Sequence, residues 1–412
     1  MLYQIDLEQY TKTHLRELEV LLTCASPQSD SEKRDLLKSL LQNPINWPIL
    51  LKLANRHRVM PLVYTSLNPL SELIPPSAIK QLTLDFRLNS RQNLLLSGEL
   101  LNLLLLFEKE GIQSLPFKGA TLAALAYGNC SLRQFSDLDI LIREQDIEKA
   151  KAVLLSQGYR MKVERIQLTS EQEETFLRSP DIYHFVREAA YPFVHPQSHL
   201  VIELHWAIMP KYFSFCLETK DFWETLESVT ISGQEVPTLS PESTLFALIG
   251  HGTKDCWKQL SRIADIAYLI RNHPQLNWEK ILQQAQHQRV QRMLGLGLSL
   301  ASELLGIDLP ENIQQQLSRD PSLKTLLPGV YQQLFEPQVS SISDGTQTRF
   351  HLQVREHIGD RLNYFFQLAT TPTTSDWLLL PVAEFPQLPY YFLRPYRLVR
   401  EQIVKALQKS RN

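Results

Sequence analysis

The spacing of apolar residues predicts helices at the start of the chain. In residues 1–110, apolar positions recur about every three to four residues, which is the spacing of amphipathic helices. Asn46 followed by Pro48 is a typical helix start. Asn89–Lys109 reads as a long amphipathic helix, and Gly111 is a typical residue just after a helix end. We therefore expect an N-terminal helical region over residues 1–110.

Shorter apolar runs bounded by glycine replace this pattern in residues 111–240. Asp137–Ile142 alternates polar and apolar residues before ending in an apolar run, as strands do. The predicted strands are 112–117, 137–142, 159–168, 182–187, 191–195 and 200–205, and the predicted helices between them are 121–127 and 145–157. This region is expected to form an α/β core with a mixed sheet.

Helical spacing returns after residue 240. The predicted helices are 242–250, 259–271, 278–288 and 290–305. From about Ser322 the chain is helical with expected breaks at Pro337, Thr371–Thr374, Pro381, Pro386, Pro389 and Pro395. The predicted fold class is α+β, in which an N-terminal helical region (1–110), the core (111–240), a helical domain (241–320) and a C-terminal helical segment (321–412) follow one another.

Two helical segments on either side of the core resemble each other. Residues 45–59 and 276–290 align, with Trp47 matching Trp278. Two copies are too few for a solenoid. The similarity is either a coincidence between amphipathic helices or a duplicated helical unit that flanks the core.

Composition and charge narrow the class of protein. Hydrophobic residues make up 43% and charged residues 21%, which is typical of globular proteins. Lys and Arg total 42 against 44 Asp and Glu, a formal net charge of −2. A near-neutral chain is not expected to bind nucleic acid, because such binding usually needs a basic surface.

The sequence also bears on the cellular compartment. The four cysteines, Cys24, Cys130, Cys216 and Cys256, are too far apart for a CxxC zinc or redox site. The N-terminus lacks the pattern of a signal peptide, and the longest apolar runs are far shorter than a membrane span. We expect a soluble cytoplasmic protein.

Candidate chemistry lies in the stretch from residue 115 to 142. Asp137 and Asp139 would share one face of their strand. Neighbouring carboxylates repel each other unless a cation lies between them, and Mg²⁺ binds carboxylates together with substrate phosphates. The Lys118–Gly119 corner would offer backbone N–H groups at a helix start to a phosphate. An Asp-x-Asp pair alone would also fit the solvated end of a strand. Here the pair follows a strand, a glycine corner and a helix, and this whole arrangement is more specific than the pair by itself.

This arrangement resembles the nucleotidyltransferases of the DNA polymerase β superfamily. It is similar most closely to an uncharacterised bacterial nucleotidyltransferase family, over nearly the whole chain. The matching residues are Trp47, His57–Val59, Lys118–Gly119, Leu122, Tyr127, Arg133, 137–142, Asp146, Ala150, Leu154, Gly158–Tyr159, Glu203–Trp206, His251–Lys254, Trp257, Leu260, Asp265–Ala267 and Leu393–Leu398.

The resemblance implies a two-metal site. Asp137, Asp139 and Glu203 would be the catalytic, metal-binding carboxylates, holding two Mg²⁺ ions. Glu203 would also accept the proton of the acceptor. The alternative for Glu203 is a surface carboxylate on an edge strand. His195, His199 and His205 match no zinc spacing, and His205 is expected to support or pack against the site.

The resemblance also implies a site for the triphosphate. Lys118, Gly119, Arg133 and Lys254 would bind the nucleotide, with the 241–320 domain closing the site. The alternative for Lys118 and Arg133 is a solvated side chain or an ion pair within the protein, and the alternative for Lys254 is a solvated residue of its helix. Ala120 stands where the superfamily often has a phosphate-binding serine, so that contact is lost or replaced, for example by Lys118 or Thr121. We expect Asp265 to have a structural role.

The predicted function is transfer of a nucleoside monophosphate from an NTP, such as ATP, to an acceptor hydroxyl or phosphate, with release of pyrophosphate. The acceptor would be a small molecule, a peptide or a protein. The alternative is a catalytically inactive nucleotide-binding or scaffold protein that acts through its helical flanks. The sequence leaves open the acceptor, the preferred base, the pathway and the oligomeric state.

Overall fold

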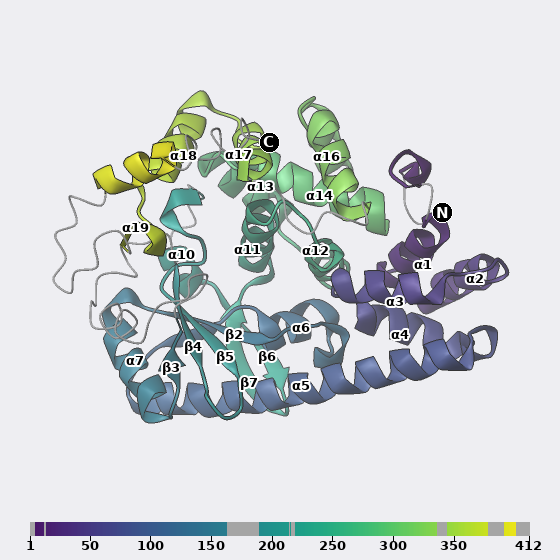
Figure 1. The fold of residues 1–412 in the computed structure, drawn as a ribbon, viewed down its shortest axis with the longest axis horizontal. Helices are drawn as coiled ribbons and strands as arrows, with labels where there is room; N and C mark the ends of the chain where they lie inside the picture. Colours follow the sequence, from purple (N-terminus) through teal and green to yellow (C-terminus); the bar gives the residue numbers. More distant parts are fainter. Residues whose placement is uncertain are drawn as a thin grey trace. The chain divides into compact units, whose positions relative to one another are not determined.

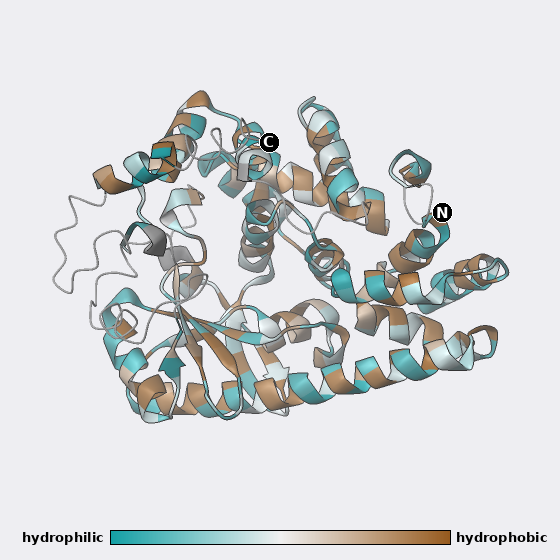
Figure 2. Ribbon diagram, in the orientation of Figure 1, coloured by the Kyte–Doolittle hydropathy of each residue, from teal (hydrophilic) through white to brown (hydrophobic). Residues whose placement is uncertain are grey.

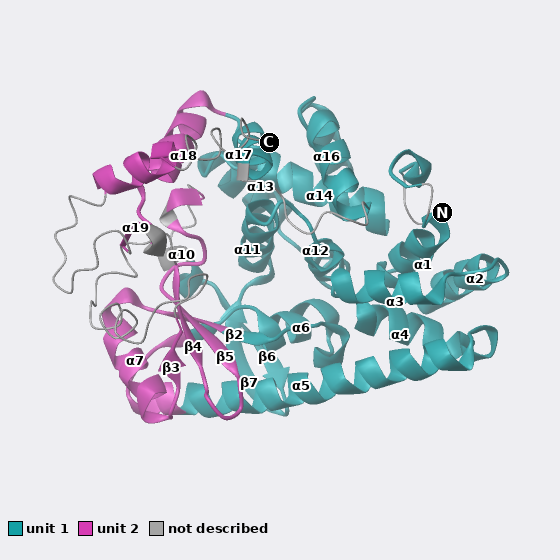
Figure 3. Cartoon of the chain, in the orientation of Figure 1, with its two compact units in different colours: residues 1–105, 115–138, 220–356 teal, residues 106–114, 139–219, 357–412 magenta. Residues whose placement is uncertain are grey.

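The computed structural model describes residues 5–11, 14–162, 189–213, 215, 219–335, 344–377 and 391–400. The chain has the expected mixed α and β composition. It forms two compact units, each assembled from three segments (Figure 3). Unit 1 contains residues 1–105, 115–138 and 220–356, and unit 2 contains 106–114, 139–219 and 357–412. In the described part of the chain, no helix is both long enough and apolar enough to cross a membrane.

The N-terminal segment of unit 1 is helical, as predicted (Figure 1). Its helices are α1 (Leu15–Ala25), α2 (Asp30–Leu41), α3 (Trp47–Arg56), α4 (Met60–Leu67) and α5 (Pro76–Lys109), with the short 3₁₀ helices η1 (Leu7–Gln9) and η2 (Asn68–Leu73). The last residues of α5, 106–109, belong to unit 2. Asn46 caps α3 as expected, because its side chain accepts a hydrogen bond from the N–H of Ile49.

Helix α5 is longer than predicted. It runs unbroken for 34 residues from Pro76, so the predicted start at Asn89 was wrong. Polar and apolar residues alternate along it (Figure 2), and its apolar stripe includes the buried Leu82, Leu96 and Leu103. Packing of this stripe outweighs the weak helix propensity of the residues around Asn89.

The later segments of unit 1 add helices and a hairpin. They are α6 (Gly119–Tyr127), η3 (Cys130–Leu132), α11 (Pro241–Lys254), α12 (Leu260–Asn272), α13 (Trp278–His287), α14 (Gln291–Leu305), α15 (Glu311–Ser318), α16 (Leu323–Phe335) and α17 (Asp344–Gln353). The antiparallel hairpin of β6 (Leu226–Ile231) and β7 (Gln234–Leu239) was not predicted. Its turn residues Ser232 and Gly233 both have positive φ, which suits a tight hairpin.

The two similar helical segments share their local structure. Asn277 caps α13 by accepting from the N–H of Lys280, as Asn46 caps α3. Arg58 and Arg289, directly after the C-caps of the two helices, have φ of 54° and 57°. Both copies therefore begin and end in the same way. A chance similarity between amphipathic helices would not require these matched ends.

A five-stranded sheet has the order β1-β2-β5-β4-β3. Its strands are β1 (Ser114–Pro116), β2 (Asp137–Ile142), β3 (Arg160–Met161), β4 (Ala190–Val194) and β5 (Val201–His205). Strand β4 is antiparallel to β3 and to β5, and Glu203 lies opposite Pro192 in the β4–β5 pair. The predicted strand 182–187 and residues 163–168 of another lie outside the described residues.

The helical parts of unit 2 complete the fold. They are η4 (Glu144–Asp146), α7 (Ile147–Ser156), η5 (Lys211–Phe213), α18 (Ile358–Thr370) and α19 (Thr374–Trp377), and residues 391–400 are also helical. Helix α10 (Thr219–Glu224) lies where the chain passes to unit 1. The break predicted at residues 371–374 is present, but the one at Pro395 is not, because Pro395 lies within helical residues 391–400. The breaks predicted at Pro337, Pro381, Pro386 and Pro389 lie outside the described residues. The four-region division of the chain stays a prediction.

Candidate active site

Two neighbouring strands of the sheet carry the candidate acidic residues. In β2, Asp139 is 4% exposed, between the buried Leu138 and Ile140. In β5, Ile202 and Leu204 are buried, and Glu203 lies between them. Because alternate residues of a strand share a face, Glu203 points away from these two aliphatic side chains. Adjacent strands of unit 2 therefore bring together two carboxylates that are far apart in sequence.

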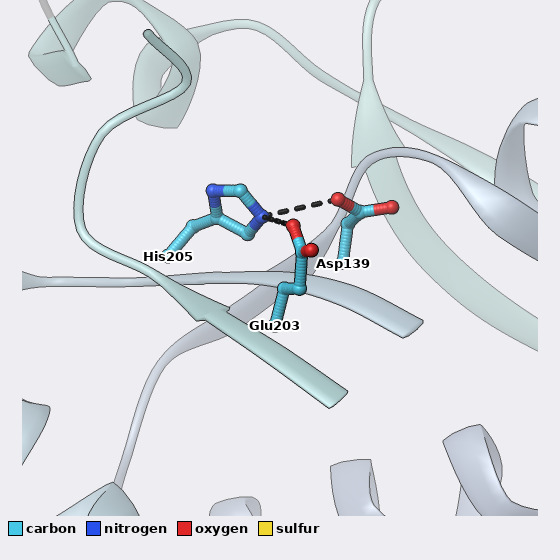
Figure 4. Close-up of side chains that lie close together, drawn as sticks. All are labelled: Asp139, Glu203 and His205. Atoms are coloured by element: carbon cyan, nitrogen blue, oxygen red, sulfur yellow. Dashed lines mark hydrogen bonds and ion pairs between the residues drawn. The ribbon is translucent and has the colours of Figure 1, made fainter. Parts of the chain in front are cut away.

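His205 contacts both of these carboxylates through one ring nitrogen (Figure 4). Its Nε2 is 3.0 Å from an oxygen of Asp139 and 3.2 Å from an oxygen of Glu203. Its Nδ1 is 3.3 Å from the carbonyl oxygen of Ala207. One donor atom from each of the three side chains lies within 4.8 Å of the others. The cluster offers two oxygens and one nitrogen to a metal ion.

His205 was expected to support or pack against the site, and its contacts with both carboxylates agree with the supporting role. Glu203 and His205 are two residues apart in β5, as Asp137 and Asp139 are in β2. The same alternation that pairs the two aspartates on one face pairs Glu203 with His205. That signal was present in the sequence. His205 contacts both carboxylates, so it is more than a packing residue beside them.

Asp137 is the first residue of β2 and is half-buried. It lies two residues before Asp139 on the same strand, which places both side chains on one face. The three-residue cluster of Asp139, Glu203 and His205 does not include it. The structure thus brings together two of the three predicted metal-binding carboxylates, and a metal-binding role for Asp137 stays a prediction.

The Lys118–Gly119 corner lies against the start of β2. Gly119 has φ of +54°, and a Cβ at this position would lie 3.3 Å from the backbone oxygen of Asp137. Only glycine fits this corner without strain. Thr121, which we considered as a replacement for the missing serine, is fully buried, and its hydroxyl donates to the carbonyl oxygen of Lys118. The Thr121 hydroxyl therefore supports the corner itself.

Arg133 takes part in a buried ion pair. Its Nε and Nη2 donate to the two carboxylate oxygens of Asp265, at 2.9 Å and 3.1 Å. The hydroxyl of Tyr127 donates to the same carboxylate, at 2.8 Å. Burial, together with the negative charge of Asp265, raises the pKa of Tyr127 well above its ordinary value. The expected structural role of Asp265 is confirmed, while a phosphate contact from Arg133 stays a prediction.

Lys118 and Lys254 both influence the carboxylate of Asp255 in unit 1. Burial acts to raise the pKa of Asp255, but Arg262, Lys254, Lys258 and Lys118 act against it, and the net effect is a lowered pKa. Four cations thus lie close enough to Asp255 to stabilise its charge. The two lysines predicted to bind the triphosphate thus both act on Asp255, and their contact with a phosphate stays a prediction.

These features define an α+β protein with a carboxylate-rich candidate metal site and a glycine corner. Residues 43–306 match the sequence profile of a family described as uncharacterised nucleotidyltransferase. The match covers more than half of the chain and contains every residue of the site described above. The chain belongs to this family.

One solved structure similar to this chain is an antigenic nucleotidyltransferase-like protein from Paracoccidioides brasiliensis. The match has 19% sequence identity and a TM-score of 0.30, and it covers 52% of this chain and 94% of the other. No curated protein matches the sequence.

Proposed function

We propose that this protein is a metal-dependent nucleotidyltransferase that transfers a nucleoside monophosphate from an NTP to an acceptor, releasing pyrophosphate. One observation carries the proposal. Asp139, Glu203 and His205 converge within 4.8 Å from neighbouring strands, inside the segment that matches the family. We also place the family in the DNA polymerase β superfamily, on the order of the glycine corner, the helix and the Asp-x-Asp strand.

The donor set fits a divalent cation. Asp139 is nearly fully buried, and a buried carboxylate close to a second one is costly without a positive partner. We propose that Asp139 and Glu203, together with Asp137, hold the metal, and that two Mg²⁺ ions occupy the complete site. When bound, the metal would neutralise the triphosphate and lower the pKa of the attacking hydroxyl.

The protein residues would position the reactants. An acceptor oxygen attacks the α-phosphorus, the bond from this phosphorus to the bridging oxygen breaks, and pyrophosphate leaves. Glu203, whose side chain is 32% exposed, would receive the acceptor proton. The N–H groups at the start of α6 and the ammonium groups of Lys118 and Lys254 would offset the charge of the phosphates.

The acceptor in this proposal is a hydroxyl or phosphate of a small molecule, peptide or protein. The near-neutral charge of the chain argues against nucleic acid. The proposal differs from the inactive-scaffold alternative in one respect: it requires turnover, whereas the alternative requires nucleotide binding alone.

The test begins with binding of a fluorescent NTP analogue, with and without Mg²⁺ or Mn²⁺. We expect metal-dependent binding by the unaltered protein and its loss in the Asp139→Asn and Glu203→Gln variants and in the Asp137→Asn, Asp139→Asn double variant. Glu227→Gln, which neutralises an exposed carboxylate on β6, is the matched control and should bind normally. Unchanged binding in the double variant would refute the site.

Turnover is then measured with each of the four NTPs labelled at the α-phosphate. Pyrophosphate release and label transfer are followed with the protein itself and with pools of hydroxyl compounds as acceptors. We expect label transfer that falls at least about a hundred-fold in Asp139→Asn. Metal-dependent binding without pyrophosphate release in any pool would favour the inactive nucleotide-binding alternative.

A further inference from the structure

Unit 1 contains a cavity that the proposed chemistry has not used. Its volume is about 660 Å³, which is the size of a site for a small molecule. Three parts of unit 1 line it: helix α5, the junction between α3 and α4, and residues 134–136. In the third part, Ser136 directly precedes Asp137, the first residue of β2.

The α5 wall is a continuous stripe along the helix. Asp85, Leu88, Gln92 and Leu95 are three or four residues apart and so share one face. The stripe is about 15 Å long at 1.5 Å per residue. Leu88 and Leu95 are each 55% exposed, and both line the cavity. The wall therefore presents apolar surface over a length that suits an elongated ligand.

Two arginines give the cavity a positive charge. Arg58, from the α3–α4 junction, and Arg91, from α5, both line it and both are exposed. Among the described residues, neither guanidinium group makes a hydrogen bond or ion pair. The single acidic side chain in the lining, Asp85, accepts a hydrogen bond from Gln81. The guanidinium groups can therefore receive an anionic group of a ligand.

The walls are held together by side-chain amides. The side-chain oxygen of Gln134 accepts from the N–H of Met60 at 3.3 Å, which ties the start of α4 to the segment before β2. The buried Asn93 on α5 donates to the carbonyl oxygens of Cys130 and Arg133, at 2.7 Å and 2.8 Å. The cavity is thus formed before a ligand arrives, which lowers the entropic cost of binding.

We infer that this cavity is a binding site for an elongated amphiphilic anion. The carboxylate or phosphate group of the ligand binds Arg58 and Arg91, and its apolar body lies along Leu88 and Leu95. This ligand chemistry rests on the cavity itself and goes beyond the proposed nucleotidyl transfer.

The test uses the full-length protein and two probes, octyl phosphate and octanoate, whose binding is measured by calorimetry below their micellar concentrations. We expect both to bind, and their affinities to fall at least about ten-fold in the Arg58→Gln, Arg91→Gln double variant. Arg58→Lys, Arg91→Lys should retain part of the affinity. The control Arg34→Gln, Arg319→Gln removes two exposed arginines elsewhere in unit 1 and should have no effect. Inorganic phosphate, which has no apolar body, should bind at least about ten-fold more weakly than octyl phosphate.

Several outcomes would overturn the inference. The inference fails if neither amphiphile binds, or if the Arg34→Gln, Arg319→Gln control loses as much probe affinity as the Arg58→Gln, Arg91→Gln variant. It also fails if the Arg58→Gln, Arg91→Gln variant binds the probes as tightly as the unaltered protein. Displacement of the fluorescent NTP analogue by octyl phosphate would assign the cavity to the nucleotide and also overturn it. Because probe binding is measured without an NTP, its failure is separate from failure of the nucleotide-binding test.

Discussion

Arg133 and Asp265 lie 132 residues apart in sequence and form a two-point ion pair inside unit 1. Asp265 is fully buried, and its carboxylate also receives the hydroxyl of Tyr127. The pair fixes the segment that leads into β2 against helix α12. This gives Arg133 a structural role that is independent of any phosphate contact.

We expect Arg133→Gln to lower the free energy of unfolding by about 3–5 kcal/mol, because it leaves the buried Asp265 carboxylate without its positive partner. Urea denaturation measures this loss. The matched control is Arg262→Gln, which breaks an Arg–Asp pair whose two side chains are each 23% exposed and should cost about 1 kcal/mol. If Arg133→Gln lost nucleotide affinity but no stability, the main role of Arg133 would be the phosphate contact and not the ion pair.

The glycine corner can be tested by adding one methyl group. Gly119→Ala and Gly128→Ala both force a residue with a Cβ into positive φ, so each should lose about 1–2 kcal/mol of stability. Only at Gly119 does the new Cβ meet a neighbour, the backbone oxygen of Asp137, whereas nothing lies within 4 Å at Gly128. We therefore expect only Gly119→Ala to weaken metal-dependent NTP binding as well. Equal effects of the two variants on NTP binding would contradict a role of this corner in the site.

Local features of the chain could be predicted from the sequence. The cap at Asn46, the strand Asp137–Ile142 and the end of α5 before Gly111 all depend on a few neighbouring residues. The β6–β7 hairpin was missed because its alternation is weak: exposed Glu and Gln residues and Pro237 interrupt the apolar positions.

Non-local features were harder to predict. Asp139 and His205 are 66 residues apart, and their contact depends on β2 and β5 being neighbours, which no local pattern encodes. The resemblance supplied Glu203, and strand alternation places His205 on the same face, but no spacing showed that both would meet Asp139. The cavity at Arg58 and Arg91 needs three separate segments to come together, so it could not be predicted at all.

Asn46 and Asn277 cap their helices in the same way, so losing either cap should lower stability by a similar amount. Asn46→Ala and Asn277→Ala should each cost about 1 kcal/mol, because each removes the side-chain acceptor at the start of its helix. Asn46→Ser and Asn277→Ser keep an acceptor oxygen and should be close to neutral. Urea denaturation of the four variants checks this. A loss at one position alone would show that the two segments differ in energetics despite their similar ends.

His57 should make stability depend on pH. Burial, with a smaller contribution from Arg56, lowers the pKa of His57 to about 3, and its Nδ1 accepts from the N–H of Leu260. Below the unfolded pKa of about 6.5, the unfolded chain binds a proton that the folded chain does not, so stability falls as the pH drops from 6.5 towards 3.

Between pH 7 and pH 5 this histidine should account for about 2 kcal/mol of lost stability. His57→Gln should be less stable at pH 7 but lose less than the unaltered protein on acidification. Urea denaturation at both pH values measures the difference. His287→Gln, at an exposed position of α13, is the control and should keep the full pH dependence. An unchanged pH dependence in His57→Gln would contradict the lowered pKa.

The histidine in the carboxylate cluster should set the metal preference. An imidazole nitrogen is a better ligand for Mn²⁺ than for Mg²⁺, which prefers oxygen alone. After treatment with EDTA, both ions should raise the melting temperature, because they bind only the folded protein, and Mn²⁺ should act at the lower concentration. His205→Asn should narrow the difference between the ions, while Asp139→Asn with Glu203→Gln should abolish both shifts. If His205→Asn kept the full Mn²⁺ preference, His205 would be a partner of the carboxylates and not a metal ligand.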